Sequence, residues 1–153
     1  MTEPDQSSSG ARFSKTDVVA IPEHAASIRQ EFSTWLTGHF ALDRIKASDI
    51  VLAVNEALAN AVEAAYADAP APGVMHVRAD FDRQSGLLTV TVTDEGRWRP
   101  ATAQVANSAR GRGIPLMQAL TDHASIEPSD AGTQVRLQWD AVEAAVADAA
   151  GGG

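Results

Sequence analysis

Glu56 and Asn60 are the residues best placed for chemistry, within the stretch DIVLAVNEALANAVEAAY. Apolar residues recur there every three or four positions, which predicts a helix from Asp49 to about Ala67. Glu56, Asn60 and Glu63 share that spacing on another face, and asparagine is a poor helix former. A carboxylate one turn before an amide can direct two oxygen atoms toward a hard cation or a hydroxyl group. The ordinary alternative is an amphipathic helix whose polar face is solvated.

A second candidate is Asp94, which ends a predicted strand and is followed by Glu95 and Gly96. An aspartate at a strand end can accept a hydrogen bond from an amine donor, and Gly96 lets another group approach the backbone. The alternative is a simple turn.

A third candidate is the Gly111-Arg112-Gly113 segment, which precedes a predicted helix. Paired glycines permit a loop to wrap around an anion, and the helix start offers unpaired N–H groups. Arg112 and the nearby Arg110 add cations that suit phosphate oxygens. The alternative is a hinge with a solvated arginine. The segment is neither a P-loop nor a dinucleotide fingerprint, because the other residues of both motifs are missing.

Several further elements must position these residues. Before the central helix we expect a strand over 18–21, a helix from Pro22 that stops at Gly38, and a connection over 42–46. After it we expect strands over 74–81 and 87–94 and then a long loop over 97–110. The chain should end with a helix from 114, a short strand over 124–127 and a last strand over 133–139. Ser48 or Asp49 is the expected cap of the central helix. Because the strands are grouped in hairpins, this order predicts an α+β two-layer sandwich, with helices on one face of a mixed, mostly antiparallel sheet.

Composition sets the limits of this interpretation. A chain of 153 residues suggests one domain over 17–140, between a disordered arm at 1–16 and a flexible acidic Ala/Gly tail at 141–153. The net charge of −8 argues against non-specific binding to nucleic acid or to an anionic membrane. Without cysteine there is no disulfide or thiolate metal site. No apolar run is long enough to span a membrane, so we expect a cytoplasmic protein.

The order of the three candidates, followed by Gly-Thr before the last strand, resembles the Bergerat ATP-binding fold of the GHKL superfamily. Within it, NEALANAVEAAY, VTVTDEGRWRP, GRGIPLMQALTD and GTQVRLQW resemble the small anti-sigma factor serine kinases of the RsbW/SpoIIAB group. The resemblance covers roughly residues 18–139. Its most specific part is the string Gly-Arg-Gly-Ile-Pro-Leu-Met after Asp-Glu-Gly.

The resemblance implies roles on the adenine and metal sides of an ATP site. Asn60 would ligate Mg²⁺ through its amide oxygen, and Glu56 would act as the general base on a serine hydroxyl. Asp94 would accept the adenine amine, and Gly96 would let adenine lie against the backbone. Thr133 would contact the adenine side directly or through water.

The resemblance also implies roles on the phosphate side. Gly111, Arg112 and Gly113 would hold the phosphates, and residues 97–110 would form a lid. Arg110 and Ile114 complete the expected nucleotide-binding segment.

The function implied by the resemblance is that of an ATP-dependent anti-sigma factor. It would sequester a sigma factor and phosphorylate an anti-anti-sigma partner of the STAS class on serine or threonine, and relatives suggest a homodimer. One departure bears on catalysis: Ala64 stands where many relatives carry a histidine, although Tyr66 keeps the following aromatic residue.

Two alternatives remain. One is a regulatory module that senses ATP without transferring phosphate. The other is a detached histidine kinase catalytic domain, which needs a phospho-accepting histidine on a dimerising helix. The four histidines lack that setting in the sequence: His24, His39, His76 and His123.

Overall fold

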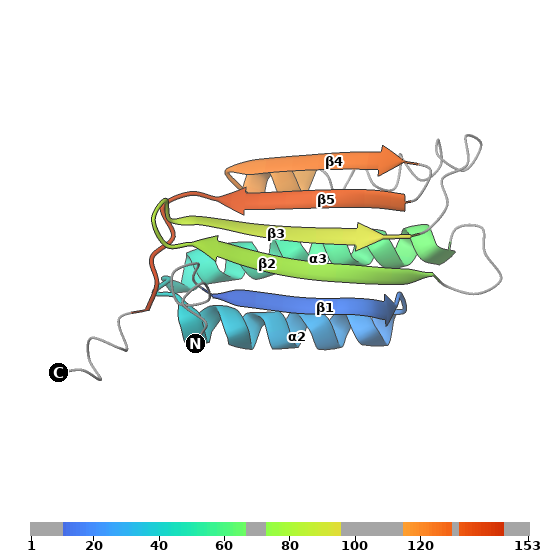
Figure 1. Ribbon diagram of the computed structural model, residues 1–153, viewed down its shortest axis with the longest axis horizontal. Helices are drawn as coiled ribbons and strands as arrows, with labels where there is room; N and C mark the ends of the chain where they lie inside the picture. The colour runs from blue at the N-terminus through green and yellow to red at the C-terminus, as the bar shows by residue number, and fades with distance from the viewer. Residues whose placement is uncertain (1–10, 67–72, 96–114, 130–131, 146–153) are drawn as a thin grey trace, which may run out of the picture.

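The structure is a computed structural model, and it describes residues 11–66, 73–95, 115–129 and 132–145 (Figure 1). Its named elements are β1 (Arg12–Val19), α2 (Pro22–His39), α3 (Arg44–Tyr66), β2 (Val74–Asp82), β3 (Leu87–Asp94), β4 (His123–Ser129) and β5 (Gly132–Trp139). Residues 115–120 are also helical. No helix in these ranges combines the length and the apolar character needed to cross a membrane.

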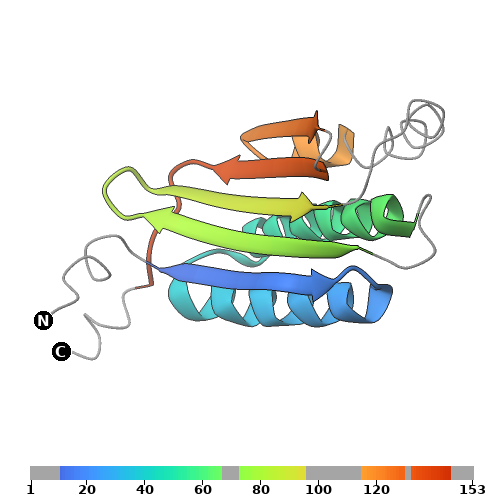
Figure 2. The same ribbon diagram turned by 45° about the vertical axis from the view of Figure 1, so that its right-hand side comes forward.

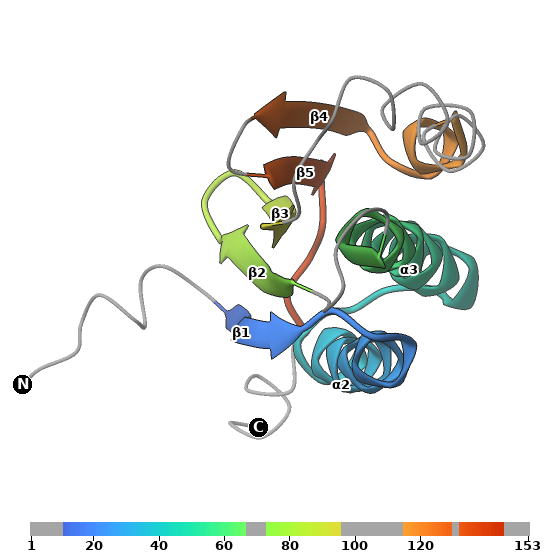
Figure 3. The same cartoon turned by 90° about the vertical axis from the view of Figure 1, so that its right-hand side faces the viewer.

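The five strands form one sheet in the order β1-β2-β3-β5-β4, and every pairing is antiparallel. In β2 and β3, apolar residues alternate with polar ones, so one face of each strand is buried and the other is partly exposed. The helices lie on one side of the sheet, as the end-on view shows (Figure 3). The predicted α+β sandwich with helices on one face is therefore confirmed, although the described strands pair only in antiparallel fashion, where a mixed, mostly antiparallel sheet was expected.

The hydrophobic core lies between the sheet and the two long helices. Helix α2 contributes Ile28, Phe32 and Leu36, which recur every fourth residue and are buried. Phe32 packs edge-on against Phe13 of β1, with ring centroids 5.6 Å apart. An aromatic cluster therefore joins the first strand to the first helix, although the chain contains few aromatic residues.

Strand β1 begins earlier than its apolar residues predict. It runs from Arg12, so the expectation of a disordered arm through residue 16 is wrong for residues 12–16. The residues before Val18 are mostly polar, but Phe13 packs on α2, and Lys15 of β1 forms an ion pair with Glu31 of α2. Its pairing with β2 shifts register between Lys15 and Val18, and Asp17 has a positive φ of 56° there. This is a β-bulge.

Helix α3 also begins earlier than predicted. It starts at Arg44, and the carboxylate of Asp43 accepts a hydrogen bond from the Lys46 backbone N–H at 2.7 Å. The expectation that Ser48 or Asp49 caps this helix is therefore wrong, because Asp43 supplies the cap one turn earlier. The other end, at Tyr66, agrees with the prediction.

Residues 141–145 pack against the domain, so the expectation of a flexible tail from residue 141 is wrong for this segment. Val142 is buried, and its backbone N–H donates to the Gly86 carbonyl at 2.8 Å. Ala144 forms an antiparallel bridge with Phe40. The segment therefore covers the end of the core that lies beside the β2–β3 turn.

The C-terminal strands confirm the expected hairpin but extend it. Strand β4 covers His123–Ser129, longer than the expected 124–127, and includes Pro128 at the edge of the sheet. The helical residues 115–120 are anchored beneath it by buried Met117 and by a 2.8 Å hydrogen bond from Trp139 Nε1–H to the Leu120 carbonyl. The predicted loop at 97–110 lies outside the described residues.

Candidate functional site

Asp94 and Thr133 lie side by side where β3 ends and β5 begins. They are direct partners in the antiparallel ladder, and the Thr133 backbone N–H donates to Asp94 Oδ1 at 3.3 Å. Only 4% of Asp94 and 2% of Thr133 is exposed. Both side chains alternate in phase with the buried residues of their strands, so they point toward the helical layer. The structure therefore brings together two of the predicted adenine-side residues.

The contact between these strand ends depends on Gly132, which was not among the predicted site residues. Its φ is +144°, and a Cβ atom there would lie 1.8 Å from the Asp94 carbonyl oxygen. No side chain fits that space, so the glycine lets β5 approach the backbone of Asp94 closely. A Gly-Thr pair before a strand is the only sequence signal for this role.

Asn60 lies in the last two turns of α3, on the helical side of the sheet. The C-terminal half of α3 runs beside β3 toward the end where that strand stops, as two views agree (Figures 1 and 2). Asn60 and Asp94 therefore lie at the same end of the domain, which the nucleotide hypothesis requires.

The Asn60 amide is a buried polar group in the interior of a helix. Only 8% of the residue is exposed, and no hydrogen bond joins its side chain to another residue in the described ranges. Leaving a buried amide unsatisfied costs about 1–3 kcal/mol, so such a group calls for an explanation. An amide oxygen that awaits a cation or a ligand donor provides one.

Glu56 lies one helical turn before Asn60 and is partly exposed. Its carboxylate forms no ion pair or hydrogen bond with another residue in the described part of the chain. A carboxylate at the rim of a site, next to a buried amide, can receive a proton from an incoming hydroxyl group.

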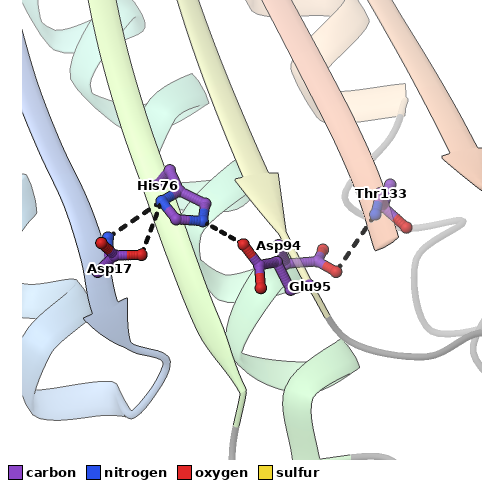
Figure 4. A network of polar contacts seen from close by, with 5 residues as sticks. All are labelled: Asp17, His76, Asp94, Glu95 and Thr133. Atoms are coloured by element: carbon purple, nitrogen blue, oxygen red, sulfur yellow. Dashed lines mark hydrogen bonds and ion pairs between the residues drawn. The ribbon is translucent and has the colours of Figure 1, made fainter. Parts of the chain in front are cut away.

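A chain of polar contacts crosses the open face of the sheet beside Asp94 (Figure 4). His76 Nε2 lies 2.7 Å from a carboxylate oxygen of Glu95, and the Asp17 backbone N–H donates to His76 Nδ1 at 3.0 Å. In the sequence His76 lacks the setting of a phospho-accepting histidine, and no pattern there shows that residues 17, 76 and 95 meet.

The remaining predicted site residues lie outside the described ranges. They are Gly96, Arg110, Gly111, Arg112, Gly113 and Ile114. Their assignment to the nucleotide site stays a prediction from the sequence.

No group of three or more His, Asp or Glu side chains that could hold a metal ion is found among the described residues. A Mg²⁺ ion held through Asn60 would therefore draw most of its shell from phosphate oxygens and water, which Mg²⁺ commonly does. A separate cavity of about 750 Å³ lies on the open face of the sheet, between residues such as Arg12, Arg78 and Thr89. It contains none of the predicted site residues.

Comparison with known proteins agrees with this arrangement. Residues 18–139 match the family model described as the histidine kinase-like ATPase domain. Among solved structures, the chain is similar to the crystal structure of the RsbU and RsbW domains of Rv1364c from Mycobacterium tuberculosis, with 25% sequence identity and a TM-score of 0.65. The match covers 87% of this chain but only 33% of that one. The family match spans both strand ends and the helix that carries Asn60, and this chain therefore belongs to the histidine kinase-like ATPase domain family.

Proposed function

We propose that this protein is a cytoplasmic, ATP-binding anti-sigma factor that phosphorylates an anti-anti-sigma partner of the STAS class on serine or threonine. The observation that carries the proposal is the buried Asn60 amide, which has no hydrogen-bonding partner among the described residues and lies at the same end of the domain as Asp94 and Thr133. A polar end of this kind fits a nucleotide that spans from the strand ends to α3. The likeness to a structure that contains an RsbW domain supports the regulatory class.

The described residues account for two parts of nucleotide binding. Asp94 directs a buried carboxylate toward the helical layer, where it would accept the exocyclic amine of adenine and so distinguish adenine from guanine. Asn60 would hold Mg²⁺ through its amide oxygen, and that ion would neutralise charge on the phosphate oxygens. The phosphates themselves are assigned to the segment 110–114 by the sequence.

Phosphoryl transfer then needs a base at the rim. In the proposed reaction the partner's serine oxygen forms the new bond to the γ-phosphorus while the bond to the ADP oxygen breaks. Glu56 would take the serine proton, and ADP would be the leaving group. Transfer of this kind depends mainly on positioning and on compensating charge. The protein's negative charge suits a basic surface on a sigma factor better than it suits DNA.

A second candidate, an ATP-sensing module without kinase activity, is favoured by one observation: Ala64 occupies the place of the relatives' histidine. The histidine kinase alternative is less well supported. The His24 and His39 rings contact the carbonyls of Val19 and Trp35 at 2.8 and 2.9 Å, and His76 and His123 lie in strands.

Calorimetric titration tests the nucleotide site. Wild-type protein should bind Mg-ATP, and Asp94→Asn should bind it at least about 10-fold more weakly, a loss of about 1.4 kcal/mol, because an amide presents one acceptor fewer to the adenine amine. Asp80→Asn, on the open face, is the matched control and should bind like wild type. A wild-type protein that ignores adenine nucleotides would contradict the proposal.

Labelled ATP separates the two candidates. With a STAS-domain protein as acceptor, wild type should transfer phosphate, and Glu56→Gln should transfer it about 10²- to 10⁴-fold more slowly while it still binds ATP. Binding without any transfer by the wild type would leave the ATP-sensing module as the function.

A further inference from the structure

Glu95, the residue that follows Asp94, is held from several directions at the end of β3. Its backbone N–H donates to the Val74 carbonyl at 3.1 Å, which extends the pairing with β2 past the end of the strand. On the other side of β3, its Cα would lie 3.0 Å from a Cβ atom placed on Gly132. Its side chain turns to the open face of the sheet and meets His76 (Figure 4).

The contacts of His76 define which ring nitrogen carries the proton. The Asp17 backbone N–H can only donate, so Nδ1 accepts that bond at 3.0 Å. In the neutral ring the proton therefore sits on Nε2, which donates to the Glu95 carboxylate 2.7 Å away. Each nitrogen has one partner, so both the ring's orientation and its tautomer are specified.

At the Asp17 end of this series of polar contacts, the position of the donor is fixed by the backbone. Asp17 has a φ of 56° at the β-bulge between Lys15 and Val18, and the bulge turns its N–H toward β2 instead of leaving it in the regular ladder. A strained bulge lowers the stability of the fold unless another interaction compensates for it, and here the bulge supplies the donor that orients His76. The Asp17 carboxylate lies 3.9 Å from Nδ1, beyond hydrogen-bonding distance.

We propose that His76 is a positioning residue for the adenine side of the nucleotide site. This inference rests on the proposed function. His76 holds Glu95 against β2, and Glu95 in turn fixes the backbone of Asp94, whose carboxylate recognises adenine. Strand ends fray when nothing anchors them, and a recognition group must be held within about 0.5 Å of its productive position. The open face of the sheet thus controls a group on the opposite face.

A double-mutant cycle on His76 and Glu95 tests the inference, with Mg-ATP and Mg-ADP affinity measured by calorimetry. We expect His76→Ala and Glu95→Ala each to weaken both nucleotides about 5-fold, and the double variant to bind no more weakly than either single one. Equal losses for ATP and ADP point to the adenine side. Gln at position 76 retains an N–H that can reach Glu95, so His76→Gln should recover most of the affinity.

Arg78→Ala is the matched control. Arg78 lies two residues along β2 on the same face, but its 3.0 Å ion pair with Asp80 stays within that strand. This variant should bind both nucleotides within about 2-fold of wild type. Amide hydrogen exchange of the nucleotide-free protein gives a second readout, because the Glu95 amide should exchange faster in His76→Ala and not in Arg78→Ala.

Two failures can be told apart. A wild-type protein that binds nucleotide, with His76 variants of equal affinity and unchanged exchange at Glu95, overturns this inference alone. Additive losses in the double variant also overturn it. A wild-type protein that binds neither nucleotide overturns the proposed function and this inference together.

Discussion

At the scale of single residues, Asn60 is an unfavourable residue type for the buried helical position that it occupies. A helix interior favours alanine over asparagine by about 0.5 kcal/mol, and a buried amide without a partner costs more than that. The neighbouring Ala61 and Val62 are buried and apolar, as this position would be if packing alone decided it. An asparagine at this position fits the proposed role of its amide oxygen as a ligand of Mg²⁺.

Asn60→Ala should therefore leave the melting temperature unchanged or raise it, while calorimetry detects no Mg-ATP binding. Asn55→Ala is the control on the same helix. Asn55 lines a groove between α2 and α3, away from the strand ends, and its loss should not change nucleotide affinity. An Asn60→Ala protein that melts at a much lower temperature would assign the side chain a structural role.

Gly132 is the second decisive residue, because it sets the distance between β5 and Asp94. Gly132→Ala places a Cβ against a carbonyl oxygen at a φ of +144°, so we expect a loss of about 3 kcal/mol in the free energy of unfolding. Gly38→Ala is the control: nothing lies within 4 Å of a Cβ at that helical position, and stability should rise by up to about 1 kcal/mol. Urea denaturation measures both.

At the scale of elements, the sequence predicts best where the pattern is local. Strands β2 and β3 alternate strictly, and their predicted ranges agree with the structure within a residue. Strand β1 does not alternate between apolar and polar residues over most of its length. It is a strand because it pairs with β2, some sixty residues away in the chain, and because Phe13 meets α2. No local pattern contains that information.

The start of α3 gives an element-scale prediction. Asp43→Ala should cost about 1 kcal/mol and lower the melting temperature by about 3 °C, because the Lys46 N–H loses its acceptor. Ser48→Ala, at one of the positions predicted as the cap, should change stability by no more than about 0.5 kcal/mol. Thermal unfolding followed by circular dichroism compares the two, and the opposite ranking would place the cap at Ser48.

At the scale of the whole molecule, residues 141–145 complete the fold. Val142 enters the core, and backbone hydrogen bonds of 2.9 Å join Ala41 to Glu143 and Ala145 to His39. An acidic, alanine-rich composition suggested a loose tail because composition does not reveal what a segment packs against.

Two truncations test this role. A chain that ends at Asp140 should lose about 3 kcal/mol in the free energy of unfolding, since it loses the burial of Val142 and its backbone bonds. A chain that ends at Ala145 keeps Val142 and these backbone bonds, so it is the control and should be more stable than the shorter chain. Trp35, whose ring lies 5.2 Å from that of Phe40, provides a fluorescence signal near the lost contact. Equal stability of both truncations would contradict the packing of this segment.

The sequence singled out some members of the candidate site, but not the contacts that hold them in place. Asn60 and Asp94 were chosen by residue type and order, and Thr133 by the family resemblance; the structure places the three at one end of the domain, and their roles toward a nucleotide stay predictions. The contribution of Gly132 depends on how two strands approach, and that of His76 depends on a bulge in a strand that the sequence does not outline. Both are consequences of tertiary pairing, which a single sequence does not display.

The two outer strands carry features that discourage further strands from joining the sheet. A bulge with a left-handed aspartate interrupts β1, and a proline interrupts β4. Natural proteins use both devices to keep an unpaired strand from acting as a template for another chain. A protein partner is therefore not expected to bind by adding a strand to this sheet, and the proposed partners would bind through side-chain surfaces instead.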